Sequence, residues 1–254
     1  MNQTEEEKFY NKVAKKFGGY AYGNYNYKMD SEYPDGNPEK DFKGKLLELK
    51  GNKKVLDVGC GDCKFAFEIA PYFSEIIGID TSSELLKVAN EKKKTLKNNN
   101  VSVFFQNAKK TDFDDSSFDI IFCRRGPTYF KEYYRLLNKG GYYLEIGIGE
   151  KDTQELQEIF GRGQGFGKWE KSRLIKNIKE FEKAGFEKVF AKDYFYDEYY
   201  ATYEDLDRFL QGVPIFTDFD SEKDRKKLEE YVGKFKTPKG IRLPRHRIVM
   251  VIGK

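Results

Sequence analysis

Four residues in the first third of the chain have the types and spacing to bind a nucleoside. Asp57 ends the apolar run in "KKVLDVGCGD", Gly59 and Gly61 follow it at once, and Asp80 comes nineteen residues later at the end of "EIIGID". Glycines in a strand-to-helix turn let a ligand approach the backbone closely. A carboxylate at the end of the next strand can accept hydrogen bonds from both hydroxyls of a ribose. The spacing therefore predicts a nucleoside-bearing cofactor lying across the end of a sheet.

The residue at the third glycine position of the dinucleotide fingerprint separates two kinds of cofactor. That fingerprint reads G-x-G-x-x-G, and here Lys64 stands where its last glycine would be. A side chain there crowds the helix start on which a pyrophosphate would rest. The turn around Gly59 and Gly61 therefore favours a cofactor that carries an amino acid in place of a diphosphate.

Short apolar runs alternate with amphipathic segments around this turn. The pattern predicts strands at 54–59, 75–80, 101–106, 117–123 and 140–148, and helices at 63–73, 82–96 and 129–137. Such alternation indicates βαβ units and a parallel sheet covered by helices on both faces. The carboxyl ends of the strands then share one edge of the sheet, where Asp57 and Asp80 would meet.

The two ends of the chain differ from this core. Thr4 and Glu7 form a capping box for a first helix, and a loop rich in Gly, Asn and Tyr follows at 18–38. After residue 150 we expect a glycine-rich segment (160–169), a helix near 174–181, a strand at 187–200, a helix at 221–235 and a last strand at 247–254. We interpret the chain as one domain, 1–254, made of a lid (1–38), a cofactor-binding core (39–150) and a substrate half (151–254). The substrate half contains a cap inserted at about 199–240.

Four stretches together resemble one family. "VLDVGCGD", "IIGIDTSSELLKVA", "NAKKTDFDDSSFDIIFC" and "LLNKGGYYLEI" are similar, in order and spacing, to the motifs of class I S-adenosylmethionine-dependent methyltransferases, over residues 53–148. The resemblance implies an α/β fold with a Rossmann-like, doubly wound, mostly parallel sheet of seven strands. It also implies that the last strand is antiparallel and lies between the fifth and the sixth, with the helical lid and the cap added to this core.

The resemblance also implies a set of residues that bind S-adenosylmethionine. They are Asp57, Gly59, Cys60 and Gly61 for the methionine part, Asp80 and Thr81 for the ribose, Asn107 and Ala108 for the adenine, and Cys123 and Arg124 at the end of the fourth strand. Two positions depart from the family pattern, because Cys63 stands where a third glycine is frequent and Asn107 where an acid is common. An asparagine oxygen can still accept a hydrogen bond from the adenine amino group.

Fewer residues of the sequence point to the substrate than to the cofactor. Arg124 and Arg125 end the strand beside the expected methyl group, and there they either clamp a substrate anion or brace the sheet end with salt bridges. Tyr20 and Tyr22 in the aromatic loop, and Arg162 and Gln164 in the glycine-rich segment, are further candidates for substrate contact. No residue stands out as a catalytic base.

Composition limits the partners. The chain has 46 basic and 42 acidic side chains, a net charge of +4, and no strongly basic region, which argues against a nucleic-acid partner without ruling one out. We expect no membrane span, no metal site and a cytoplasmic location, because apolar runs are short and only three cysteines and one histidine are present.

The sequence indicates methyl transfer to a small molecule, with an anionic group as one option. RNA or protein methylation, an NAD(P)-dependent oxidoreductase and a non-catalytic binding module for S-adenosylmethionine stay open, as does the oligomeric state.

Overall fold

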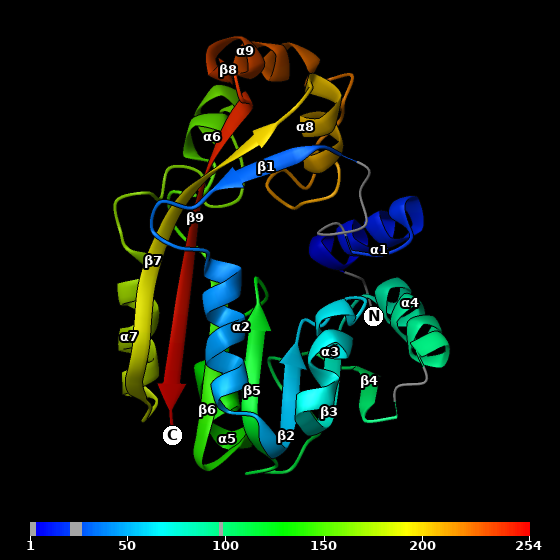
Figure 1. Ribbon diagram of the computed structural model, residues 1–254, viewed down its shortest axis with the longest axis vertical. Helices are drawn as coiled ribbons and strands as arrows, with labels where there is room; N and C mark the ends of the chain where they lie inside the picture. Colours follow the sequence, from blue (N-terminus) through cyan, green and yellow to red (C-terminus); the bar gives the residue numbers. More distant parts are fainter. Residues whose placement is uncertain (1–3, 21–26, 97–98) are drawn as a thin grey trace.

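One sheet runs through the whole molecule. The computed structural model describes residues 4–20, 27–96 and 99–254. Its strands are β1 (Met29–Glu32), β2 (Gly51–Val58), β3 (Phe73–Asp80), β4 (Val101–Phe105), β5 (Phe118–Arg124), β6 (Leu137–Ile148), β7 (Glu187–Tyr200), β8 (Lys236–Thr237) and β9 (Gly240–Gly253). Their order is β1-β7-β9-β6-β5-β2-β3-β4, and β8 pairs with β9 (Figure 1).

The pairing confirms the expected topology of the core. β3 and β5 flank β2 in parallel, β4 extends the sheet beside β3, and β6 extends it beside β5. β9 runs antiparallel between β6 and β7, which places the last strand between the fifth and sixth strands of the core. The carboxyl ends of the parallel strands therefore form one edge, and this edge carries the predicted site.

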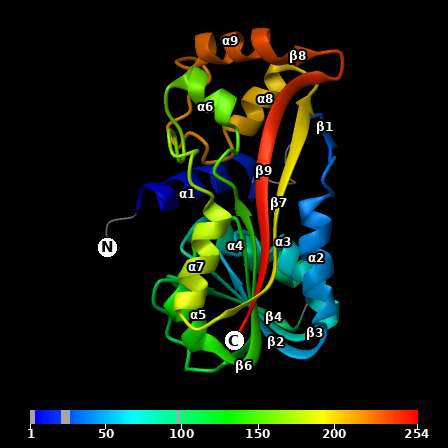
Figure 2. The ribbon, with the colours of Figure 1, turned by 90° about the vertical axis from the view of Figure 1, so that its left-hand side faces the viewer.

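Helices cover both faces of this sheet. They are α1 (Glu5–Phe17), α2 (Pro38–Glu48), α3 (Lys64–Ile69), η1 (Ala70–Tyr72), α4 (Ser83–Leu96), α5 (Phe130–Leu136), α6 (Gln154–Phe160), α7 (Arg173–Lys183), α8 (Tyr203–Leu210) and α9 (Arg225–Phe235). α2 and α3 pack on one face through Phe42, Leu46 and Phe67, while α5 and α7 pack on the other through Tyr133 and Phe181 (Figure 2).

The sheet has more strands than the seven expected. Residues 29–32, which lie within the stretch predicted to be a loop, form β1 against the free edge of β7, from Met29 opposite Tyr200 to Glu32 opposite Asp197. The last strand also begins at Gly240, seven residues before the predicted start. Both differences have one cause, because β7 and β9 continue together for 14 residues each and offer an edge beyond the core.

The cap is built on this extension of β7 and β9. α6, α8 and α9 surround the upper ends of the two strands (Figure 1), and their apolar side chains share a third core with Leu243 of β9. Phe9 and Val13 of α1 belong to the same core. α1 also packs along α4, the helix that follows β3. The first helix therefore bridges the cap and the core across the carboxyl edge of the sheet.

Candidate functional site

The turn after β2 needs its glycines because of its backbone conformation. Gly59 and Gly61 have φ values of 69° and 55°, a region that L side chains rarely adopt. The backbone N–H groups of Gly59 and Cys60 donate to the Ile79 carbonyl at 2.9 and 3.1 Å, which ties the turn to the end of β3.

Asp80 is held rigidly where the ribose is expected. One carboxylate oxygen accepts from the Gly61 N–H and the other from the Ser82 N–H, both at 2.8 Å. Burial raises the pKa of Asp80, while these backbone donors act in the opposite direction. A carboxylate offers about four lone-pair positions and two are used here, so two remain for a diol.

Asp57 has a different environment. Its side chain is buried, burial raises its pKa to about 7, the nearby Arg124 lowers it and the Asp80 charge raises it further. Within the described ranges no group donates a hydrogen bond to this carboxylate, although it lies on a cavity wall. A buried carboxylate without a donor is suited to an ammonium or another cationic group.

A cavity of about 330 Å³ opens over these residues. Of the residues expected to bind the cofactor it is lined by Asp57, Gly59, Cys60, Gly61, Asp80, Thr81, Asn107, Ala108 and Arg124, and Tyr20 and Arg125 also line it. Six carboxyl groups (Glu6, Glu7, Asp57, Asp62, Glu68 and Asp80) face three cations (Lys64, Arg124 and Arg125) on its wall. The wall is therefore predominantly acidic.

These features fit the cofactor that the resemblance implies. S-adenosylmethionine carries a sulfonium, an ammonium and a carboxylate, and its net positive charge complements an acidic wall. A dinucleotide would bring two negative phosphates to the same wall, which disfavours it. The Asn107 oxygen already accepts from the Lys109 N–H at 2.9 Å, and its second lone pair remains for an adenine amino group.

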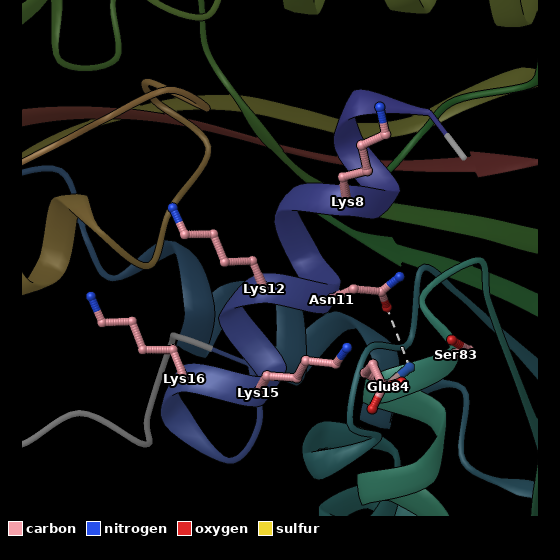
Figure 3. A pocket seen from close by; sticks show the side chains of 7 residues that line it. All are labelled: Lys8, Asn11, Lys12, Lys15, Lys16, Ser83 and Glu84. Carbon is pink, nitrogen blue, oxygen red and sulfur yellow. Dashed lines mark hydrogen bonds between the residues drawn. The ribbon is translucent and has the colours of Figure 1, made fainter. Parts of the chain in front are cut away.

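Helix α1, which belongs to the predicted N-terminal lid (1–38), covers the cavity. Thr4, Glu6, Glu7 and Tyr10 line the cavity from this helix. Asn11 fixes the helix to the start of α4, since its side-chain oxygen accepts from the Ser82 hydroxyl at 2.7 Å and from the Glu84 N–H at 3.3 Å (Figure 3). The backbone N–H of Ser82 also donates to Asp80. Ser82 therefore contacts both the lid helix and the side chain expected to bind the ribose.

The outer side of α1 forms a separate groove. It has a volume of about 570 Å³ and is lined by Lys8, Asn11, Lys12, Lys15, Lys16, Ser83 and Glu84. Figure 3 shows the four lysines on α1, with Ser83 and Glu84 at the start of α4 beside the helix. None of the residues expected to bind cofactor or substrate lines this groove. We therefore assign the site to the cavity beneath the helix.

Arg124 and Arg125 end β5 beside this cavity, and both reach one carboxylate. Arg124 donates to Glu39 of α2 at 2.9 Å and stacks on Phe65 at 4.2 Å, and Arg125 pairs with the other oxygen of Glu39. Successive side chains of a strand point to opposite faces. Arg125 has a φ of 61°, which ends the strand geometry and brings both guanidinium groups to the same side. Although burial raises the pKa of Glu39, the two arginines outweigh it and lower the pKa to about 2.

A smaller chamber of about 40 Å³ joins the cavity beneath the cap. Glu6, Tyr10, Tyr20 and Arg125 line both spaces, and the chamber continues to Asp152, Gln157, Gln164, Arg245 and Arg247. Gln164, a substrate candidate, is therefore part of the chamber wall. The volume has room for only a few water molecules.

The remaining predicted residues lie elsewhere. Cys123 is fully buried in the core, with its sulfur 3.5 Å from the Pro127 carbonyl oxygen, and does not line the cavity. Arg162 pairs with Asp218 and Asp224 in the cap, outside both spaces. Tyr22 lies outside the described residues. No cluster of three or more potential metal-ligating side chains occurs within those residues, Cys60 and Cys63 included.

Comparison with known proteins supports the resemblance to methyltransferases. A family model described as a methyltransferase domain matches residues 49–172. The uncharacterised methyltransferase YcgJ of Bacillus subtilis is 33% identical over 122 residues, which are 45% of this chain and 48% of YcgJ. Its crystal structure superposes with a TM-score of 0.61 at 18% identity, covering 84% of this chain and 97% of that one, which shows the fold.

Two relatives have named substrates. A demethylmenaquinone methyltransferase of Listeria welshimeri is 32% identical over 127 residues, 46% of this chain and 53% of the relative. Phosphoethanolamine N-methyltransferase 3 of Arabidopsis thaliana is 31% identical over 160 residues, 58% of this chain and 31% of the relative. The chain thus spans about half, or less, of the length of the curated relatives that it matches.

Proposed function

We propose that the chain is a class I S-adenosylmethionine-dependent methyltransferase and that it methylates a small molecule bearing an anionic group; the match of residues 49–172 to a methyltransferase domain supports this. The sulfonium supplies an activated methyl group when the cofactor is bound. The role of the protein is then to hold the acceptor in line with the methyl group, and such alignment can contribute about 7–11 kcal/mol. Gly59, Gly61, Asp57 and Asp80 are the residues that we assign to the cofactor.

The observation that carries the anionic acceptor is the pair of arginines at the end of β5. Both guanidinium groups pair with the one carboxylate of Glu39, and both arginines line the cavity. Arg125 lines both the cofactor cavity and the chamber, so its guanidinium lies where the two reactants would meet. Arginine binds carboxylate and phosphate groups through its planar fork.

Two further observations support a small acceptor. The space beyond the cofactor cavity is about 40 Å³ and is lined by side chains of α1 and of the cap. The two relatives with named substrates act on demethylmenaquinone and phosphoethanolamine, which are small molecules, and phosphoethanolamine is an anion. None of the helices within the described ranges is long and apolar enough to cross a membrane.

The test compares acceptors in the presence of S-adenosylmethionine. We expect release of S-adenosylhomocysteine with small carboxylate or phosphate compounds, and at least about tenfold less with their esters or uncharged analogues. Arg125→Lys keeps the charge but loses the fork, so kcat/KM should fall roughly 10–100-fold, equivalent to about 1.5–3 kcal/mol. Cofactor affinity should be unchanged.

Arg135→Lys is the matched control. Arg135 pairs with Glu132 and Asp115 and lines neither the cavity nor the chamber, so this variant should retain full activity. If methyl groups enter RNA or protein at physiological salt, and no small acid is methylated, the small-molecule proposal is wrong. If Arg125→Lys lowers the melting temperature and leaves KM unchanged, the arginines only brace the sheet.

A further inference from the structure

Two hydrogen-bond acceptors belong to side chains that line the chamber, an exposed one and a buried one. They are the carboxylate of Glu6, at the start of α1, and the side-chain oxygen of Gln157, in α6. Glu6 has no hydrogen bond or ion pair within the described ranges, although it lines both the cofactor cavity and the chamber. Its position at the junction places it beside both reactants.

Gln157 is the more constrained of the two. It is 3% exposed, and its amide nitrogen donates to the Asp152 carbonyl at 3.0 Å and to the Thr153 hydroxyl at 3.3 Å. A carbonyl can only accept, so this contact fixes which end of the amide is nitrogen. The side-chain oxygen of Gln157 is then buried with no partner. An unpaired buried acceptor is unfavourable by roughly 1–3 kcal/mol, and a ligand that donates would remove the penalty.

The ligand must therefore supply N–H or O–H donors to this end of the chamber and an anion to Arg125. A hydroxyl has one proton and can satisfy one acceptor, whereas a primary ammonium has three donors and can satisfy both. The carboxylate of Glu6 also favours a cation over a neutral hydroxyl. The donor count and the charge of the wall both point to an amine.

We propose that the acceptor is a small amine that also carries a carboxylate or phosphate, and that Glu6 binds and deprotonates the amine nitrogen. This inference rests on the proposed methyl transfer. The bound ammonium gives one proton to the Glu6 carboxylate, which later passes it to water. The freed lone pair forms the N–C bond to the methyl group while the C–S bond breaks, and that electron pair stays on sulfur. The products are the N-methylated amine and the thioether S-adenosylhomocysteine.

The surroundings of Glu6 agree with the role of a base. Burial raises its pKa, and the charges of Asp80 and Glu7 raise it further. A higher pKa brings a carboxylate closer to the pKa of an amine and makes the proton transfer less unfavourable. Tyr10, Tyr20 and Arg125 are the other titratable groups that line the junction beside it.

The experiment uses four sets of probes with the full chain and S-adenosylmethionine. They are small amino acids and phosphoethanolamine, the matching hydroxy acids such as glycolate, simple amines without an acid, and thiols with an acid. We expect methylation of at least one probe of the first set, and at least about tenfold lower kcat/KM for every probe of the other sets. Mass spectrometry should place the methyl group on nitrogen.

Two variants test the residues. Glu6→Gln should lower kcat at least about 100-fold and remove the acid limb of the pH profile of kcat/KM that reports Glu6, while cofactor affinity stays unchanged. Gln157→Leu should raise the KM for the amine roughly tenfold with little effect on kcat. Glu5→Gln is the matched control, because Glu5 lies in the same turn, pairs with Lys8 and lines neither space.

The possible failures can be told apart. If the chain does not bind S-adenosylmethionine, the proposed function itself is wrong. If it binds the cofactor and methylates hydroxy acids or thiols but no amine, methyl transfer stands and the amine inference is overturned. If Glu6→Gln methylates an amine as fast as the unaltered chain does, with the same pH profile, the proposed role of Glu6 is overturned.

Discussion

Asp80 holds the turn after β2, and we propose that the same side chain binds the cofactor ribose. Its two oxygens accept from the N–H groups of Gly61 and Ser82, and the same carboxylate faces the cavity. Removing it takes away the acceptor for a ribose diol. We expect Asp80→Ala to weaken the binding of S-adenosylmethionine and S-adenosylhomocysteine by about 1.5–3 kcal/mol, measured by calorimetry.

The control for Asp80→Ala is a carboxylate outside the site. Asp114 does not line the cavity, and Asp114→Ala should bind the cofactor with unchanged affinity. NADH should not bind to the unaltered chain. Tight binding of NADH together with no response to S-adenosylmethionine would contradict the assignment of the cofactor.

At the residue scale, the sequence predicted the contacts that are local. Gly59, Gly61 and Asp80 could be placed because their roles follow from a turn and the end of the next strand. The pairing of Arg124 and Arg125 with Glu39 could not, because about 85 residues separate the partners and neither segment carries a pattern that points to the other. The sequence did not decide whether the two arginines bind a substrate anion or brace the end of the sheet. In the structure they brace the sheet end through Glu39, at a position from which they could also bind an anion.

At the scale of elements, the extent of α1 and its part in a lid were predicted, but the segments it packs against were not. Thr4 and Glu7 form the expected capping box, and the helix ends at Phe17 before Gly18. Its position over the cavity depends on packing with α4 and with the cap, which are distant in sequence. The same limit explains β1, since four residues with little periodicity form a strand only because the extended edge of β7 accepts them.

The anchor of α1 gives a prediction about the lid. Asn11→Ala leaves the Ser82 hydroxyl and the Glu84 N–H without their acceptor, at a cost of about 1–3 kcal/mol in lid docking. The dissociation rate of the cofactor should rise roughly 10–100-fold in stopped-flow measurements, with little change in the melting temperature of the core. Lys12→Ala, on the exposed side of the same helix, should behave like the unaltered chain. An unchanged dissociation rate in Asn11→Ala would mean that α1 does not gate the cavity.

At the scale of the whole molecule, a buried ion cluster joins the cap to the core. Asp152 follows β6, while Arg245 lies on the extended part of β9. Arg245 donates to Asp152 at 3.0 Å and also pairs with Glu198 of β7. Arg247 pairs with Asp152 as well. All of these side chains are at most 5% exposed, so each charge depends on its partners.

Asp152 should therefore control the stability of the molecule and its dependence on pH. Burial raises the pKa of Asp152, but Arg245 and Arg247 outweigh it and lower the pKa to about 2. The folded pKa lies below the unfolded value of about 3.9, so the stabilisation is fully present above about pH 4–5 and is lost as the pH falls toward 2.

Asp152→Asn leaves two buried guanidinium groups with too few carboxylates. It should reduce the free energy of unfolding at neutral pH by about 3–5 kcal/mol in urea titrations, and should flatten its decline between pH 4 and 2. Asp218→Asn removes a carboxylate that is 70% exposed and should change stability by less than about 1 kcal/mol. Equal stability of the Asp152 and Asp218 variants at neutral pH would show that the cluster does not hold the cap on the core.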